Sequence, residues 1–229
     1  MAISVDTVYQ RVLAIANKEQ RGYITPQEFN LFADQAQMEI FEQYFYDINQ
    51  FRRMPGNNSK YADMINILED KLSYFKQGPT SVSDSNIVKD TFGDIFYRFG
   101  DINYNGKIVE EIKYEDFYKT ERTPLTKATQ NRPVYWRKDG KIYFSPISGP
   151  CAAHWIRKPA TSKWGYVVIG GKALYNSDSS VSTDFELHPA EESELVYRIL
   201  AFAGVTLEKP QLVQTAVALE GAKQQQEKA

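Results

Sequence analysis

A helical run that begins at Thr25-Pro26-Gln27-Glu28 constrains the fold more than any other feature of the sequence. This tetrapeptide is a capping box with proline at the first helical position, in which the Thr hydroxyl and the Glu carboxylate satisfy backbone N–H groups that have no helical partner. Apolar residues then recur three or four positions apart from Phe29 to Ile48, until Met54-Pro55-Gly56 ends the run. The pattern predicts a helix of about 28 residues and about 42 Å at 1.5 Å per residue, longer than the core of a small domain.

Other stretches also have the period of a helix. Apolar stripes cover residues 5–15, 61–75, 195–203 and 212–219. Gly78-Pro79 is predicted to end the second of these helices, whereas Pro189 and several glutamates precede the third, which Gly204 ends. Helices are therefore expected towards both ends of the chain.

Between the helical regions the period changes to alternation. After a Ser-rich linker at 80–85, three pairs of short alternating segments flank turns that are typical of β-hairpins, at Tyr104-Asn105-Gly106, Asp139-Gly140 and Gly170-Gly171. A short helix is predicted over Tyr114–Glu121. Helices and strands are thus segregated along the chain, which predicts an α+β fold.

We predict three segments: a helical bundle over 1–85, a β-hairpin-rich insertion over 86–182, and C-terminal helices over 183–229 that complete the bundle and end in a polar tail. A chain of 229 residues buries roughly 70% of its unfolded surface and needs no covalent staple. The single cysteine, Cys151, excludes a disulfide within the chain. Because there is no basic leader and no apolar segment of spanning length, we expect a soluble protein with no membrane partner.

Charge is unevenly distributed along the chain, although the whole sequence has a net charge of −2. Residues 122–172 contain ten basic residues and one acidic residue, a net charge of +9, which leaves −11 for the rest. Such segregation favours oriented association with an acidic partner, a neighbouring copy or nucleic acid. Basic residues that face outward on strands and prevent edge-to-edge pairing would produce the same pattern.

Two groups of residues are candidates for an interface. The first group is basic and consists of Arg132, Arg137, Lys138, Lys141, Arg157 and Lys158. The second group is Phe41 and Phe45, which lie off the main apolar stripe of the long helix. A helix with aromatic residues on more than one side needs more neighbours than one small bundle supplies, and contacts between subunits would provide them.

We expect no enzyme active site, cofactor or metal. The sequence contains no P-loop, dinucleotide-binding glycine motif, nucleophile elbow or His-Glu-x-x-His motif. Cys151 and His154 are three residues apart, so on a strand they would point to opposite faces. Zinc would find only His188 as a further soft ligand, too few for a closed structural site.

Two segments imitate calcium-binding loops. In the first, Asp101, Asn103, Asn105 and Gly106 match the beginning of the loop, but Ile112 stands where a bidentate Glu must close the ion's shell. In the second, over 17–28, Arg21 occupies a ligand position. A hairpin turn explains Asn105-Gly106 better than calcium does.

Three segments of the chain resemble virion structural proteins of short-tailed bacteriophages, including crAss-like phages. These segments are NKEQRGYITPQEFNLF at 17–32, RPVYWRKDGKIYFSP at 132–146, and WIRKPATSKWGYVVIGGKALYN at 155–176, the last followed by STDFELHP. The order of helices, β region and helices also resembles the head-to-tail adaptor class, whose members are called tail tubular protein A or ring proteins.

The resemblance implies a structural protein at the portal–tail junction of the virion, made in the cytoplasm of the host bacterium. In that class a bundle of helices packs beside its neighbours in a ring of twelve subunits under the portal, and a β portion faces the next tail component. The implied partners are copies of the chain itself, the portal protein, other tail or ring proteins, and phage DNA that passes through the channel. The class offers no catalytic residues.

Two other functions stay open at this level. A nucleic-acid-binding module would use the basic residues together with Trp136, Tyr143, Trp155 and Trp164, which interleave with them. Its affinity would fall steeply with salt concentration. Aromatic residues at alternate strand positions also build sheet cores. A calcium-responsive protein would melt at a higher temperature when calcium is added.

Overall fold

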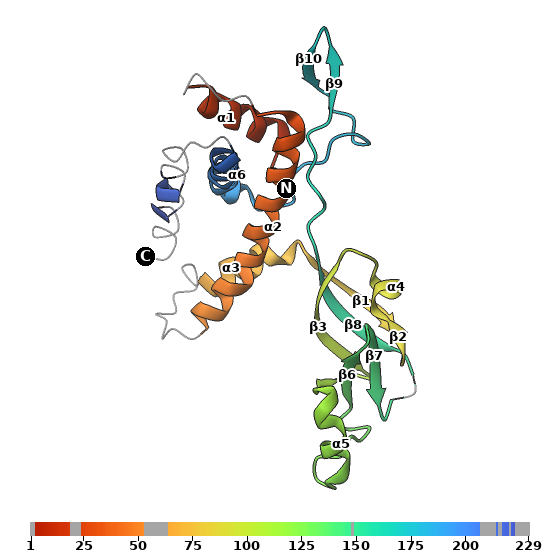
Figure 1. The fold of residues 1–229 in the computed structure, drawn as a ribbon. Coiled ribbons are helices and arrows are strands. Elements are labelled where there is room, and N and C mark those ends of the chain that lie inside the picture. Colours follow the sequence, from red (N-terminus) through yellow and green to blue (C-terminus); the bar gives the residue numbers. More distant parts are fainter. Residues whose placement is uncertain are drawn as a thin grey trace. The chain divides into compact units, whose positions relative to one another are not determined.

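The computed structural model describes residues 3–18, 24–52, 64–147 and 149–206, together with residues 214, 217–219 and 221–222. Its mixture of helices and sheets is the α+β composition that the sequence predicts (Figure 1). The chain divides into two units, each of which is described by itself. Unit 1 consists of Met1–Tyr74 and Pro159–Ala229, and unit 2 is Phe75–Lys158.

The main helices of unit 1 are α1 (Val5–Lys18), α2 (Pro26–Phe51), α3 (Met64–Ser73), the short 3-10 helix η1 (Pro189–Glu191) and α6 (Glu192–Thr206). The predicted capping box forms at the start of α2, because the Thr25 N–H donates to the Glu28 carboxylate at 2.9 Å and the Glu28 N–H donates to Thr25 Oγ1 at 3.3 Å. The predicted helix end at Met54-Pro55-Gly56 lies outside the described residues. So does part of the predicted helix over 212–219.

One face of α2 is buried against the other helices of unit 1. Its buried residues are Pro26, Phe29, Ala33, Ala36, Gln37, Ile40, Phe41, Tyr44 and Asp47. This face packs on α6 and α3, while α1 packs on α6 through the predicted stripe that includes Val5, Val8 and Val12. Each buried large apolar side chain contributes about 1.5–3 kcal/mol relative to an exposed one, so these contacts hold the helices together.

Two amide side chains on α2 hold extended segments of unit 1 that lie between the end of unit 2 and helix η1 in the sequence. Asn30 pairs with both backbone groups of Trp164: its Oδ1 accepts from the N–H at 2.7 Å and its Nδ2 donates to the carbonyl at 3.2 Å. Gln37 donates to the Ala160 carbonyl at 2.7 Å and accepts from the Glu186 N–H at 3.1 Å. Seven residues are two helical turns, so both amides lie on one side of α2.

A two-stranded hairpin, β9 (Tyr166–Ile169) and β10 (Lys172–Tyr175), belongs to unit 1. Its base is anchored by Trp164, whose ring stacks with Tyr166 and Tyr175 at 5.8 Å in each case and lies 4.2 Å from the ring of Tyr9. The indole N–H donates to Asp6 Oδ1 at 2.9 Å. With Trp164 only 2% exposed, the start of the hairpin is fixed to the helices.

Unit 2 contains two four-stranded sheets that share one core. The first has the order β1-β8-β3-β4 and the second the order β2-β7-β6-β5. Their strands are β1 (Lys76–Val82), β2 (Asn86–Ile87), β3 (Phe96–Tyr104), β4 (Lys107–Ile108), β5 (Glu110–Glu111), β6 (Val134–Lys138), β7 (Lys141–Ser145) and β8 (Cys151–Arg157). Two short helices, α4 (Val88–Phe92) and α5 (Tyr114–Arg122), complete the unit.

The core of unit 2 is built from both sheets. Ile102 and Trp155 come from the first sheet, Tyr135 and Ile142 from the second, and Phe92 of α4 packs among them. The Trp155 indole N–H donates to Thr80 Oγ1 at 3.0 Å, which satisfies its polar group on burial. The alternating burial along β7 and β8 is that of strands with one face on a core.

The boundaries between the units differ from the predicted ones at 85/86 and 182/183. The helix over 61–75 does not extend to Gly78-Pro79, because α3 ends at Ser73 and β1 begins at Lys76. β1 pairs with β8, and the register shifts between Gln77 and Thr80, where the bulge accommodates Gly78-Pro79. A local pattern does not reveal this pairing with a distant strand. The hairpin β9–β10 likewise belongs to the helical unit. Residues 159–182, which were predicted to be part of the β-rich insertion, are therefore part of unit 1.

The three predicted hairpin turns are confirmed. Both central residues have positive φ at Asn105-Gly106 (48° and 75°), Asp139-Gly140 (50° and 71°) and Gly170-Gly171 (60° and 76°). Two successive positive φ angles define the type I′ turn, which fits the twist of the flanking strands. The predicted short helix at 114–121 is also confirmed as α5.

We predict that Gln37→Leu destabilises the protein. The apolar side chain leaves the Ala160 carbonyl and the Glu186 N–H without their amide partner, at about 2–4 kcal/mol in total. Urea denaturation followed by far-ultraviolet circular dichroism measures the free energy of unfolding.

The matched control is Gln10→Leu, the same substitution at an exposed position of helix α1. It should change the free energy of unfolding by no more than about 0.5 kcal/mol. Equal unfolding midpoints for the two variants would contradict the role assigned to Gln37.

Candidate assembly surfaces

The predicted interface residues Arg132 and Arg137 are paired within unit 2. Arg132 contacts Glu110 at 2.8 Å, and Arg137 contacts Glu111 at 2.5 Å. The parallel pairing of β5 with β6 places the two glutamates beside the two arginines. All four side chains are about half exposed, so each pair contributes only about 0.2–1 kcal/mol. The pairs nevertheless neutralise two of the charges that the sequence suggested for a partner.

Lys138 and Lys141 flank the Asp139-Gly140 turn and lie opposite each other in the β6–β7 ladder. Lys138 turns towards α5, where its Nζ is 3.2 Å from the Tyr114 hydroxyl and 4.4 Å from the centre of that ring. The hydrogen bond and the positive charge of Lys138 lower the pKa of Tyr114, and the same bond raises the pKa of Lys138. This tip of the hairpin keeps a positive charge at neutral pH.

Arg157 and Lys158 are not part of the same patch. They lie at the end of β8, in the other sheet from β6 and β7. The Arg157 guanidinium lies 5.6 Å from the centre of the Phe75 ring, and the Lys158 N–H donates to the Ile95 carbonyl at 2.7 Å. The structure therefore brings together Arg132, Arg137, Lys138 and Lys141 by way of β6 and β7, and separates the other two in the fold.

Charge is less segregated in the folded units than along the sequence. Unit 2 has 14 basic and 10 acidic residues, a net charge of +4, and unit 1 has 13 basic and 19 acidic residues, a net charge of −6. The predicted values of +9 and −11 belong to stretches of sequence that the fold mixes with acidic neighbours. The sign of the difference is kept, so association between unlike units remains electrostatically favourable.

The aromatic residues proposed for nucleic-acid stacking have different environments. Trp155 and Trp164 are buried in the cores of unit 2 and unit 1 respectively, and neither presents a ring face to solvent. Trp136 is half-buried, stacked on Tyr143 at 5.8 Å and 4.0 Å from the ring of Phe117. Two of the four rings are thus core residues, as alternate strand positions favour.

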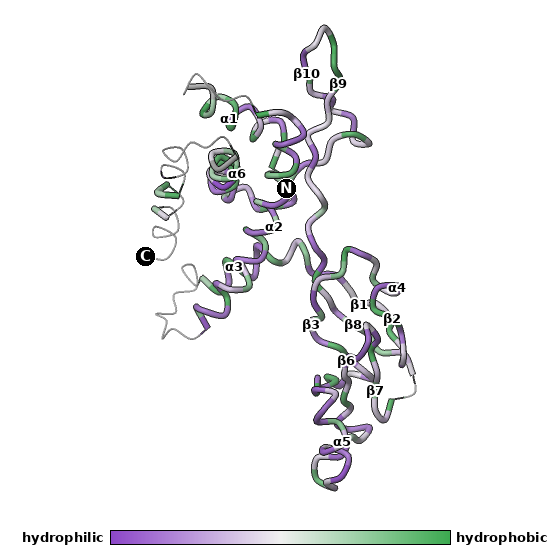
Figure 2. The backbone as a smooth tube through the Cα atoms, in the orientation of Figure 1, coloured by the Kyte–Doolittle hydropathy of each residue, from purple (hydrophilic) through white to green (hydrophobic). Residues whose placement is uncertain are grey.

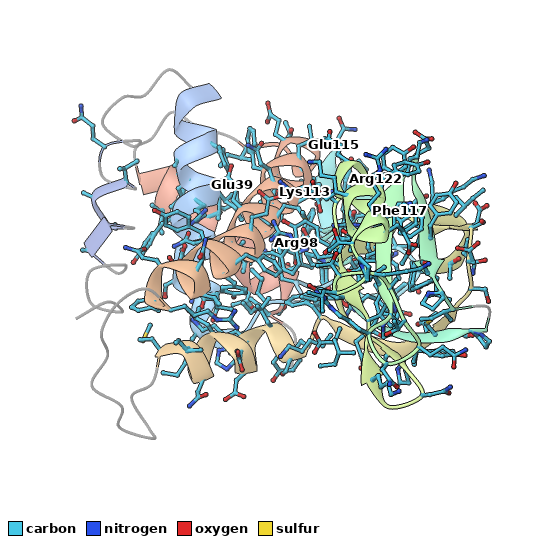
Figure 3. The ribbon with its side chains drawn as sticks, turned by 90° about the horizontal axis from the view of Figure 1, so that it is seen from below. Glu39, Arg98, Lys113, Glu115, Phe117 and Arg122 are labelled. Atoms are coloured by element: carbon cyan, nitrogen blue, oxygen red, sulfur yellow. The ribbon has the colours of Figure 1, made fainter. Side chains whose placement is uncertain are left out.

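An open groove of about 810 Å³ lies beside α5 in unit 2. Its lining residues are Glu111, Ile112, Lys113, Tyr114, Glu115 and Arg137. Figure 3 shows Lys113, Glu115, Phe117 and Arg122 along or next to this helix. Acidic and basic side chains alternate there, so the groove lacks the single positive sign that a phosphate backbone requires.

Of the two predicted aromatic interface residues, only Phe45 reaches the surface. Phe41 is fully buried inside unit 1, which corrects its assignment to a subunit contact. Phe45 is half-buried and packs edge-on against Phe41 with ring centres 5.2 Å apart. The sequence pattern places both rings off the main stripe, but the wide buried face of α2 includes Phe41.

Unit 1 contains a cluster of buried charges between α2, α3 and α6. Lys71 pairs with Glu191, and Arg198 pairs with Glu194 at 2.7 Å. The adjoining cavity has a volume of about 20 Å³, which is room for one water molecule. Arg198 also contacts Glu39 and Gln43 of α2, so the paired charges link the helices of unit 1.

No group of three or more potential metal ligands occurs among the described residues. Cys151 is buried and His154 is exposed, on opposite faces of β8 as their spacing predicts. Asp101 lies exposed on β3, and Asn105-Gly106 forms the β3–β4 turn, so the first calcium-like segment is a hairpin. Part of the second segment, including Arg21, lies outside the described residues.

Exposed apolar side chains are concentrated on the β9–β10 hairpin. Val168 and Ile169 are each 62% exposed, and Val167 and Leu174 are about half exposed. Figure 2 shows β9 as a hydrophobic strand that extends away from the helices of unit 1. Surface patches of this kind mark protein–protein contacts. The sequence feature that indicates this surface is the run of consecutive apolar residues in β9, where a strand with one buried face would alternate apolar and polar residues.

A second surface feature is the exposed stripe of α2, on the side of the helix opposite its buried face. Its exposed residues are Gln27, Leu31, Gln35, Glu42, Tyr46 and Asn49. Leu31 is 72% exposed and Tyr46 is 67% exposed. Every charged residue of α2 is acidic, including Glu39, which Figure 3 labels on this helix.

No protein-family model matches the chain, and no curated protein is significantly similar to it. Within the described residues, no helix is both long and apolar enough to span a bilayer.

We predict that Cys151 is inert in the folded protein. Burial raises the pKa of its thiol to about 11 from an ordinary value of 9.0, so at pH 8 the reactive thiolate is about a hundredfold rarer. A chromogenic thiol reagent at pH 8 should label the native protein slowly and label one thiol per chain in urea. Rapid stoichiometric labelling of the native protein would contradict the burial of Cys151.

Proposed function

We propose that this chain is a non-enzymatic structural protein of a bacteriophage virion. Copies of it form a ring that connects the portal to the tail and leaves a channel for DNA. The helices of unit 1, as a bundle with an inserted β region, make the body of the ring, and unit 2 faces other tail or ring proteins. By the resemblance described above, the ring has twelve subunits and lies at the portal–tail junction, with no cofactor.

The observation that carries this proposal is the anchored apolar hairpin. An isolated two-stranded hairpin is only marginally stable in water, and exposed valine and isoleucine side chains favour aggregation. Here the base of the hairpin is fixed by the stack of Trp164 with Tyr166 and Tyr175, while its apolar strands remain exposed. A rigid base with an uncovered apolar end is the arrangement expected of an element that is completed by another subunit.

The hairpin also lies within one of the segments that carry the resemblance, residues 155–176. The opposite net charges of the two units favour oriented contacts between copies, which a closed ring requires. A nucleic-acid-binding module has less support, because Trp155 and Trp164 are buried and the groove beside α5 carries charges of both signs.

We predict that the purified chain forms oligomers of uniform size. Native mass spectrometry and negative-stain electron microscopy, with and without the portal protein co-expressed from the same genome, measure copy number and shape. The expected result is a ring in at least one of the two preparations, because the exposed hairpin needs a partner.

A chain that is monomeric in both preparations would contradict the proposal. If that monomer also bound DNA with a steep dependence of log affinity on log salt concentration, the nucleic-acid-binding function would replace it. Weak DNA contact by an intact ring is consistent with a channel.

A further inference from the structure

We infer that the β9–β10 hairpin of one copy docks on the exposed stripe of α2 of the next copy. The inference rests on the proposed function, since it names the two surfaces that make the contact between neighbours in the ring. Both surfaces belong to unit 1, so it does not depend on how the two units are placed.

The hairpin has one face suited to such a contact. In the β9–β10 ladder, Val167 lies opposite Leu174 and Ile169 lies opposite Lys172, which puts these four side chains on the same face. Three are apolar and one is basic, and all four are exposed. Residues 159–177 contain two lysines and no acidic residue, so the whole arm is positively charged.

The stripe of α2 has the complementary character. Leu31 and Tyr46 are the large exposed apolar side chains on it, and Glu42 and Gln35 lie between them. Helix α2 contains five acidic residues and no basic residue. Apolar side chains flanked by charges of opposite sign on the two surfaces provide both the buried area and the orientation of the contact.

The two surfaces of one chain do not cover each other. Asn30 and Gln37 hold the base of the hairpin on one side of α2, whereas Leu31 and Glu42 lie about 100–140° further round the helix at 100° per residue. The hairpin and the stripe are both exposed in the single chain. A contact between two different surfaces of successive copies is heterologous, which is the kind that closes a ring.

Cysteine cross-linking tests this contact directly. Ile169→Cys and Gln35→Cys are combined in one chain, with the buried Cys151 changed to Ala, and treated with a short bifunctional maleimide. Because each chain then carries both halves of the contact, we expect a ladder of covalent dimers, trimers and larger species in denaturing gels. Both new cysteines are at exposed positions and Cys151→Ala removes one buried sulfur atom, so we expect the variant to fold.

Three controls test whether cross-linking requires both cysteines at these two positions. Each single-cysteine variant should give no ladder, and Ile169→Cys combined with Gln10→Cys on the exposed side of α1 should give none either. Covalent dimers from Ile169→Cys alone would mean that two hairpins meet each other, and this outcome would overturn the inference. Protection of Ile169→Cys from labelling only when portal protein is added, with no ladder, would assign the hairpin to that partner and overturn it as well.

Charge exchange provides a second measurement. Lys172→Glu or Glu42→Lys alone places like charges together and should raise the protein concentration needed for assembly at least about tenfold. The double variant restores opposite charges and should assemble near the original concentration. Mass photometry over a dilution series measures the change. Unaltered assembly of both single variants would overturn the assigned contact.

A protein that forms rings but gives no ladder from Ile169→Cys with Gln35→Cys keeps the proposed function and loses this contact. A protein that is monomeric with and without portal loses both.

Discussion

The extended segments of unit 1 depend on the hydrogen bonds that the side-chain amides of Asn30 and Gln37 make to their backbone groups. The extended segments around residues 160, 164 and 186 lie outside any multi-stranded sheet, so their backbone groups need other partners. The two amides supply them from one side of α2, at hydrogen-bond distances of 2.7–3.2 Å. Asn30 thereby fixes Trp164, whose ring stack holds the base of an apolar hairpin with an exposed end, while Gln37 fixes the segments at residues 160 and 186.

Local signals predicted the local structure well, and long-range contacts explain what they missed. The capping box at Thr25 and the three glycine-containing turns each depend on a few adjacent residues, and all of them form. The unit boundaries depend on β1 pairing with β8 and on 159–165 packing against α2. These contacts join residues that are far apart in the sequence, so the local pattern does not predict them. For the same reason Phe41 is a core residue, whereas its neighbour Phe45 reaches the surface.

The basic region shows how folding changes the meaning of a sequence pattern. Along the chain, Arg132 and Arg137 belong to a stretch with almost no acidic residues, but the short strand β5 brings Glu110 and Glu111 beside them. Much of the predicted attraction for an acidic partner is therefore used within unit 2. What remains is a smaller difference in charge between the units and two surfaces of unit 1 with opposite sign. The two surfaces combine charge with exposed apolar area, which suits the second copy that we propose as the partner.

The most direct measurement is a cryo-electron microscopy reconstruction of the assembled protein. We expect β9 and β10 to be buried against α2 of a neighbouring subunit, while the stack of Trp164 with Tyr166 and Tyr175 keeps the arrangement seen in the single chain. A reconstruction in which the hairpin remains exposed to solvent in the complete assembly would contradict the claim that another subunit completes it.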